Sequence, residues 1–395
     1  MSDTALPRAG LLQPVIAGLL GAFVGFASAF TIVLAAYAAV GATPAQAASG
    51  LFAVSLGTGL LTILLTWRAR IPITIAWSTP GAALLIATGM PEGGFPVAIG
   101  AFLVTALLLI IAGLARPFGN AVAAIPKPLA NAMLAGVLLD LCLAPMKAVG
   151  AQPELALPII LAWAIALRFA RLYAVPVAVL VTAIIIGFAV DLPPDALAGG
   201  WPQPVLIAPE FSWGAIIGIA LPLFIVTMAS QNVPGLAVMR ANAYELKPGP
   251  AFVATGIVSG LIAPFGGHSV NLAAITAALC AGPEAHPDPA RRWIASLSFG
   301  IAFVALAVSA SFAATFIAAS PPLLIQAVAG LALLSTLANS ASAALAEEKD
   351  RLPAVLTFVT TASGLSFFGI GAAFWGLIAG GILMALLRLR TQPLR

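Results

Sequence analysis

The sequence predicts an all-α polytopic membrane protein with fourteen membrane-crossing segments, arranged as two inverted seven-helix repeats. Of its 395 residues, 62% are hydrophobic and only 8% are charged, whereas soluble domains carry about 25% charged residues. Sixteen of its 17 basic residues fall on one side of a fourteen-crossing topology, and two of its apolar segments are interrupted by proline and glycine. Because part of any folded surface stays exposed, so apolar a chain needs lipid as its solvent. A soluble enzyme is therefore excluded.

The crossing segments follow from apolar runs, because a spanning helix needs about 20 mostly apolar residues. The apolar run that follows residues 1–12 has no convincing cleavage site, so we expect a retained first helix and not a signal peptide. Two segments, 71–88 and 264–281, are apolar but interrupted. The other twelve predicted helices lie near 12–38, 48–66, 93–115, 127–146, 154–169, 172–190, 211–236, 249–263, 292–318, 322–345, 351–366 and 369–388.

The placement of the basic residues supports this count. With fourteen crossings both termini share one side, and of the 17 lysines and arginines only Lys147 lies on the other side. If either interrupted segment did not cross the membrane, the basic residues would be divided between its two sides. By the positive-inside rule the shared side is cytoplasmic, so we expect a multi-pass protein of the bacterial inner membrane with both termini cytoplasmic.

The two halves resemble each other weakly, which predicts repeats over 1–195 and 205–395. Pro128-Leu129 with Ala135-Gly136 recurs 194 residues later as Pro322-Leu323 with Ala329-Gly330. Such identities in an Ala/Leu-rich sequence also arise by chance. The interrupted segments, however, are the third and tenth, and an odd number of crossings per repeat inverts the second repeat. Inverted repeats with broken helices are typical of secondary transporters.

Each interrupted segment is expected to be a short strand followed by a half-helix. Residues 71–77 are β-branched and aromatic, and Thr79-Pro80-Gly81 then predicts a helix start with Thr79 as N-cap. In the second segment Pro264, Gly266 and Gly267 block a regular helix, and the sequence is helix-compatible from Ser269 onward.

The half-helices predict an anion-binding site near the membrane midplane. Their unpaired N–H groups and helix dipoles favour a negative charge. We expect Thr79, Pro80 and Gly81 to face Gly267, His268 and Ser269 across a cavity and to bind a carboxylate without an arginine. The alternative is a pair of kinked helices that only pack closely.

Polar residues at membrane depth are candidates for function, because burying them in lipid is costly. His268 is one of two histidines and titrates in a range that suits proton uptake and release; alternatively it is a neutral structural cap. Gln231, Asn232 and Asn271 are candidate substrate ligands or helix-packing groups. Asp140 is a second candidate proton carrier, or a residue that reaches the outer interface.

Two other features carry weaker hypotheses. Trp77 and Phe265 are candidates to flank an aromatic ring. Glu284, His286 and Asp288 alternate in the loop after the tenth segment, which suits either a metal site or, as we prefer, a rigid cytoplasmic loop. We expect no cofactor, no metal ion, no catalytic residues and no nucleic-acid partner, and we leave a homodimer open.

Three stretches carry a family resemblance: GAFVGFASAFTIVLAA (21–36), SQNVPGLAVMRANAY (230–244) and FGGHSVNLAAITAALCAGPEAHPDPARR (265–292). They resemble the benzoate/proton symporter family, BenE, and the likeness covers essentially the whole chain. More distantly, it extends to nucleobase permeases and anion exchangers. The resemblance implies a core domain of about 12–115 plus 211–318 and a gate domain of about 127–190 plus 322–388. It also implies that substrate binds between the facing ends of the third and tenth segments.

The same resemblance bears on the substrate. Where nucleobase permeases carry functional glutamates, this chain has Gln231 and His268, and a neutral amide with an imidazole suits an anion better. We therefore expect a secondary active transporter for proton-coupled uptake of benzoate or a related aromatic carboxylate. Alternatives are a nucleobase or inorganic anion on the same fold, or a channel. An intramembrane enzyme is disfavoured, because one histidine and one aspartate on segments without a shared motif make no catalytic pair.

Overall fold

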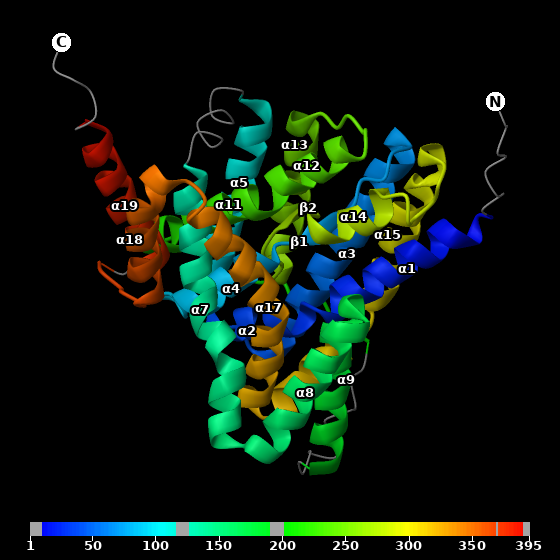
Figure 1. The fold of residues 1–395 in the computed structure, drawn as a ribbon, viewed down its shortest axis with the longest axis horizontal. Coiled ribbons are helices and arrows are strands. Elements are labelled where there is room, and N and C mark those ends of the chain that lie inside the picture. The colour runs from blue at the N-terminus through cyan, green and yellow to red at the C-terminus, as the bar shows by residue number, and fades with distance from the viewer. Residues whose placement is uncertain (1–9, 116–125, 190–200, 369, 390–395) are drawn as a thin grey trace.

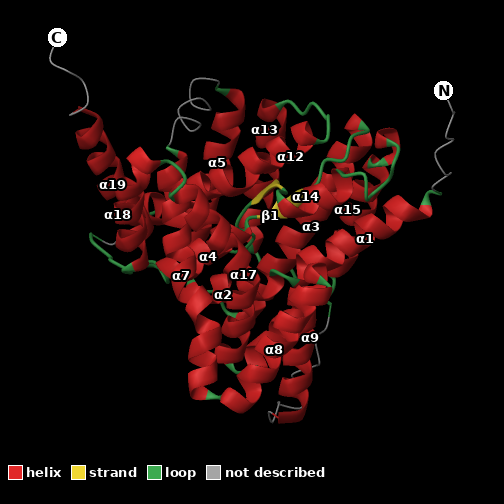
Figure 2. Cartoon of the chain, in the orientation of Figure 1, coloured by secondary structure: helices red, strands yellow, loops and turns green. Residues whose placement is uncertain are grey.

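The computed structural model describes residues 10–115, 126–189, 201–368 and 370–389. Helices dominate these residues, and one two-stranded sheet lies among them near the centre of the molecule (Figure 2). Ten of the helical stretches in the described part are long and apolar enough to cross a membrane. The prediction of an α-helical, multi-pass membrane protein is confirmed. The exact number of crossings stays a prediction.

The first half of the chain supplies an element for each of its seven predicted segments. The first segment is split into two helices, and the third is a strand followed by a short helix. The elements are α1 (Leu12–Ala27), α2 (Phe30–Ala39), α3 (Pro44–Ala69), β1 (Ile75–Trp77), α4 (Thr79–Thr88), α5 (Phe95–Leu114), α7 (Lys127–Ala151), α8 (Pro153–Phe169), the 3₁₀ turn η1 (Arg171–Tyr173) and α9 (Ala174–Ala189).

The second half repeats this plan with more irregular helices. Its first long helix, residues 213–241, contains two π-helical turns. The elements are α10 (Trp213–Ala215), η2 (Ile216–Ala220), α11 (Leu221–Thr227), η3 (Met228–Asn232), α12 (Val233–Ala241), α13 (Pro248–Ile262), η4 (Ala263–Phe265), β2 (Val270–Leu272), α14 (Ile275–Ala281), η5 (Pro289–Arg291), α15 (Trp293–Ala307), α16 (Ala310–Ala319), α17 (Pro322–Ala344), η6 (Glu348–Asp350), α18 (Arg351–Ala362) and α19 (Ala372–Leu389).

Local sequence explains where the helices begin. At α3 the Thr43 hydroxyl accepts a hydrogen bond from the Gln46 N–H, and the Gln46 side chain accepts one from the Thr43 N–H. This capping box satisfies two backbone donors that the helix leaves open. Pro44 follows in the first turn, where a missing N–H costs nothing.

Glycine pairs bring four long helices into close contact. A methyl group placed on Gly59 of α3 would lie 2.7 Å from the Gly300 carbonyl oxygen of α15. One placed on Gly113 of α5 would lie 2.6 Å from the Gly249 carbonyl oxygen of α13. Small residues let membrane helices approach this closely. The two pairs join the second segment to the eleventh and the fourth to the ninth, as expected if the two repeats are inverted.

The helices after residue 126 in the first half and after residue 322 in the second half pack against one another. Helices α7 and α17 contact each other along their length, and α18 packs on both α7 and α19. A separate apolar cluster joins α7, α8, α9 and α17, at the lower end of the molecule in Figure 1. The division into a core domain and a gate domain stays a prediction.

Candidate functional site

The two interrupted segments meet in an antiparallel strand pair. Ile75, Ala76 and Trp77 of β1 lie opposite Leu272, Asn271 and Val270 of β2. The Ser78 N–H extends the ladder by donating to the Ser269 carbonyl oxygen at 3.1 Å. The prediction of a short strand followed by a half-helix is confirmed for both segments. In an antiparallel pair the two chains leave at opposite ends, so α4 and α14 begin at opposite ends of the strand pair.

The second half-helix begins later than the sequence predicts. The expected start at Gly267–Ser269 is wrong, because α14 begins at Ile275. Strand pairing with β1 and a hydrogen bond from the Leu272 N–H to the Asn232 side chain hold residues 270–272 extended. The start of α4 is therefore joined to residues 267–269 by hydrogen bonds of Ser78. It is not joined to them as one of two facing helix ends.

The start of α4 is fixed by Ser78, one residue earlier than expected. Ser78 is the N-cap in place of Thr79, and its hydroxyl accepts a hydrogen bond from the Gly81 N–H at 3.2 Å. The same hydroxyl is 2.8 Å from the Thr227 hydroxyl of α11. Thr79 and Pro80 form the first turn of α4, with Thr79 partly exposed. One side chain thus joins the half-helix to the irregular helix of the second repeat.

His268 is fully buried beside this start, ahead of β2. Its Nε2 lies 3.1 Å from the Ser78 carbonyl oxygen, and its Nδ1 lies 2.9 Å from the Tyr37 hydroxyl. A carbonyl oxygen only accepts, so Nε2 carries a hydrogen and Nδ1 of the neutral ring accepts from Tyr37. The ring packs edge-on against Tyr37 and Phe102. His268 therefore links α2, α5 and the start of α4 and does not begin a half-helix.

The polar candidates gather around β2. Asn232, in the π-helical turn η3, is fully buried and accepts from the Leu272 N–H at 2.9 Å. Its neighbour Gln231 is half-buried. The Ser269 hydroxyl and the Asn271 side-chain oxygen are buried with no hydrogen-bond partner among the described residues. Since alternate residues of a strand share a face, these two groups lie on the same side of β2. Buried polar groups normally have partners, so these two are available to a ligand.

An aromatic cluster adjoins the strand pair. The rings of Phe26 and Phe30 stack at 5.6 Å, where α1 gives way to α2. Trp77, the last residue of β1, packs edge-on against Phe26 at 5.6 Å and Phe303 at 5.3 Å. Phe265, the other predicted aromatic, is half-buried in η4. Phe26, Phe30 and Tyr37 were missed as site residues, although two of them lie in the motif at 21–36.

The structure does not bring Asp140 to this site. Its side chain is 82% exposed on α7 and pairs with Lys147, with 2.6 Å between the carboxylate oxygen and the ammonium nitrogen. This arrangement fits the interpretation of Asp140 as a residue that reaches the outer interface.

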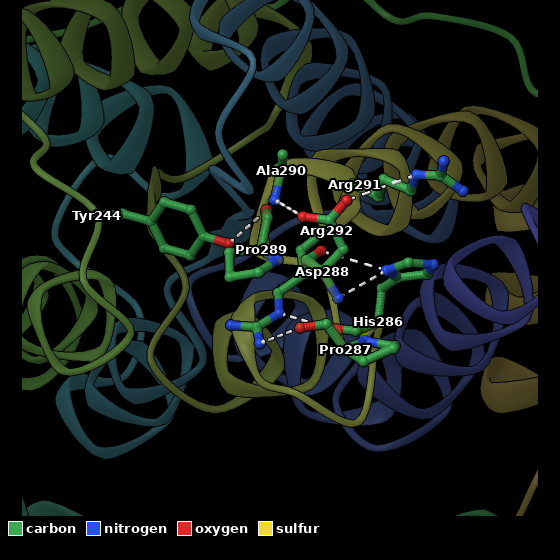
Figure 3. A network of polar contacts seen from close by, with 8 residues as sticks. All are labelled: Tyr244, His286, Pro287, Asp288, Pro289, Ala290, Arg291 and Arg292. Atoms are coloured by element: carbon green, nitrogen blue, oxygen red, sulfur yellow. Dashed lines mark hydrogen bonds and ion pairs between the residues drawn. The ribbon is translucent and has the colours of Figure 1, made fainter. Parts of the chain in front are cut away.

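The loop after α14 forms a dense hydrogen-bond network (Figure 3). Arg292 is buried, and its guanidinium donates to the carbonyl oxygens of Ala281, His286 and Pro287. The Tyr244 hydroxyl, from the loop after α12, donates to the Pro289 carbonyl oxygen at 2.8 Å. Across the described residues no group of His, Cys, Asp and Glu is arranged to hold a metal. The network fits the expected rigid loop and ties the end of α14 to α12.

Comparison with known proteins agrees with this architecture. Murine Slc26a9, an anion transporter in the inward-facing state, has a TM-score of 0.64 at 14% identity, covering 98% of this chain and 70% of that one. The transmembrane domain of the cyanobacterium bicarbonate transporter BicA has a TM-score of 0.54 at 16% identity, covering 95% of this chain and 97% of that one. At such identities these structures show the fold alone.

Relatives in sequence cover nearly the whole chain. Inner membrane protein YdcO of Escherichia coli is 42% identical over 95% of this chain and 96% of its own length. The benzoate membrane transport protein of Acinetobacter baylyi is 31% identical over 93% of both chains. The family model described as benzoate membrane transport protein matches residues 11–386. With the strand pair and half-helices described above, these matches show that the chain is a membrane transporter of the BenE family.

Proposed function

We propose that this chain takes up benzoate or a related aromatic carboxylate together with protons. The observation that best supports this proposal is the aromatic cluster of Phe26, Phe30 and Trp77, which lies at the strand pair from which α4 begins. A ring stacks on such side chains, and the N-terminus of α4 favours a carboxylate. A ligand with an apolar ring and one negative charge matches both surroundings.

Polar groups near the cluster suit the carboxylate end of such a ligand. The Ser269 hydroxyl can donate, and Gln231 offers an amide donor in the adjacent helix turn. The name of the relative from Acinetobacter baylyi also supports benzoate as the substrate.

We further propose His268 as the group that carries or senses the proton. Its Nδ1 accepts from Tyr37 in the neutral state, so protonation there requires the Tyr37 hydroxyl to turn away. Its Nε2–H donates to the carbonyl of Ser78, the residue that caps α4. A charge on the imidazole would thus arise one hydrogen bond from the half-helix that faces the carboxylate.

The substrate class is tested by uptake of labelled benzoate into proteoliposomes of the purified chain. Unlabelled benzoate and other aromatic acids should compete, whereas a nucleobase and sulfate should not. Replacing Phe30 with Ala should raise the benzoate KM by roughly tenfold, since an aromatic contact is worth about 0.5–1.5 kcal/mol beyond its buried area. Competition by sulfate or uracil equal to that by benzoate would favour the inorganic anion or the nucleobase instead.

A further inference from the structure

A groove runs along one side of α19, away from the strand pair. It encloses about 550 Å³ between three helices. Its walls are Leu129 of α7, Pro222 and Ile225 of α11, and Leu377, Gly381 and Arg388 of α19. We call it the α19 groove. Its lining is apolar except for Arg388 at one end, so the groove suits a long apolar ligand with an anionic head.

One end of the groove carries a basic residue, Arg388. Arg388 is 60% exposed and donates to Asp350 at 3.5 Å. Exposed Lys127 directly follows Pro126, another lining residue, and the segment around Asp350 carries exposed groups of both signs, namely Glu347, Glu348, Lys349 and Arg351. Arg388 thus supplies a cation at the end of an otherwise apolar groove.

The length of the groove identifies the ligand class. Its lining on α19 extends from Phe374 to Arg388, which is about 21 Å at the rise of an α-helix. One leaflet of the hydrocarbon core is about 15 Å thick, half of the full thickness. An acyl chain with a headgroup fills that length, and a single-ring carboxylate does not.

The groove lies against the helix that supports the transport site. Leu223 and Thr227 of α11 face α4, at Gly81 and at Ser78 respectively. Pro222 and Ile225 of the same helix line the groove. A ligand in the groove would therefore contact α11, which holds the start of α4. It would also contact α7 and α19, which belong to the helices after residues 126 and 322.

We propose that the α19 groove binds an anionic phospholipid from the leaflet on the side of the C-terminus, with an acyl chain along α19 and the phosphate at Arg388. Basic pockets between membrane helices bind anionic headgroups in this way. The proposal depends on the chain being a membrane protein and is independent of the transported substrate.

The test is native mass spectrometry of the purified chain, released from vesicles that contain phosphatidylglycerol or phosphatidylcholine. A Cβ atom at Gly381 would meet nothing within 4 Å, so Gly381→Phe can fill the groove without displacing the backbone. Ile382→Phe is the matched control, because Ile382 is 57% exposed and does not line the groove. Arg388→Gln removes the cation and keeps a polar side chain.

Wild type and Ile382→Phe should retain phosphatidylglycerol in preference to phosphatidylcholine, and Gly381→Phe should lose it. Arg388→Gln should reduce the preference by roughly fivefold, which corresponds to about 1 kcal/mol per basic residue near the surface. If Gly381→Phe does not fold, Ala385→Leu fills the groove near its charged end instead. Retention unchanged in a folded groove-filling variant would overturn the proposal, as would displacement of the lipid by benzoate.

Discussion

His268 shows most clearly how far single residues could be predicted. Its burial at the interrupted segment was expected, because it follows two glycines at membrane depth. Its partners could not be predicted, because Tyr37 is 231 positions away and Ser78 is 190 positions away in the sequence. The same holds for Phe26 and Phe30, whose importance comes from Trp77 on another segment.

At this scale we predict that His268→Gln separates binding from coupling. Glutamine keeps a hydrogen-bonding side chain but does not titrate, so benzoate binding should survive, weakened. Accumulation driven by a pH gradient should be lost. The measurements are equilibrium binding and gradient-driven uptake on the same preparation. A variant that still concentrates benzoate with unchanged pH dependence would make His268 structural.

At the scale of elements, apolar runs sufficed to locate the helices, and tertiary contacts decided the irregular parts. Residues 269–281 are compatible with a helix throughout, yet the first part forms β2 because β1 and Asn232 supply hydrogen-bond partners. Context of this kind routinely overrides local preference in strands. The break between α1 and α2 and the π-helical turns at 216–220 and 228–232 were not predicted either.

The glycine contacts between helices give a second prediction. Gly300→Ala places a methyl group 2.8 Å from the Gly59 carbonyl oxygen, where α3 and α15 cross. Overpacking of this kind costs about 1–3 kcal/mol, so the thermal unfolding temperature in detergent should fall. Gly381→Ala, which meets open space on α19, is the matched control and should show no loss. If Gly300→Ala and Gly381→Ala had the same unfolding temperature, α3 and α15 could move apart at their crossing without a loss of stability.

For the whole molecule, we predict that both termini face the cytoplasm. Cys142 and Cys280 are buried and free, so they can be replaced before single cysteines are introduced. Cysteines at Arg68, Arg240 and Arg291 should resist an impermeant thiol reagent in intact cells. A cysteine at exposed Gly150, at the opposite end of α7 from Lys127, should react. The reverse labelling pattern would contradict the topology.

Proton-coupled transport of an aromatic carboxylate is tested most directly by accumulation of labelled benzoate in proteoliposomes under an imposed pH gradient. The internal concentration should rise above the external one when the outside is acidic, and a protonophore should abolish the rise. Because benzoate can also leak as the neutral acid, protein-free liposomes give the background, and His268→Gln gives the uncoupled reference. Accumulation no greater than this background, or uptake indifferent to the gradient, would contradict the proposed transport.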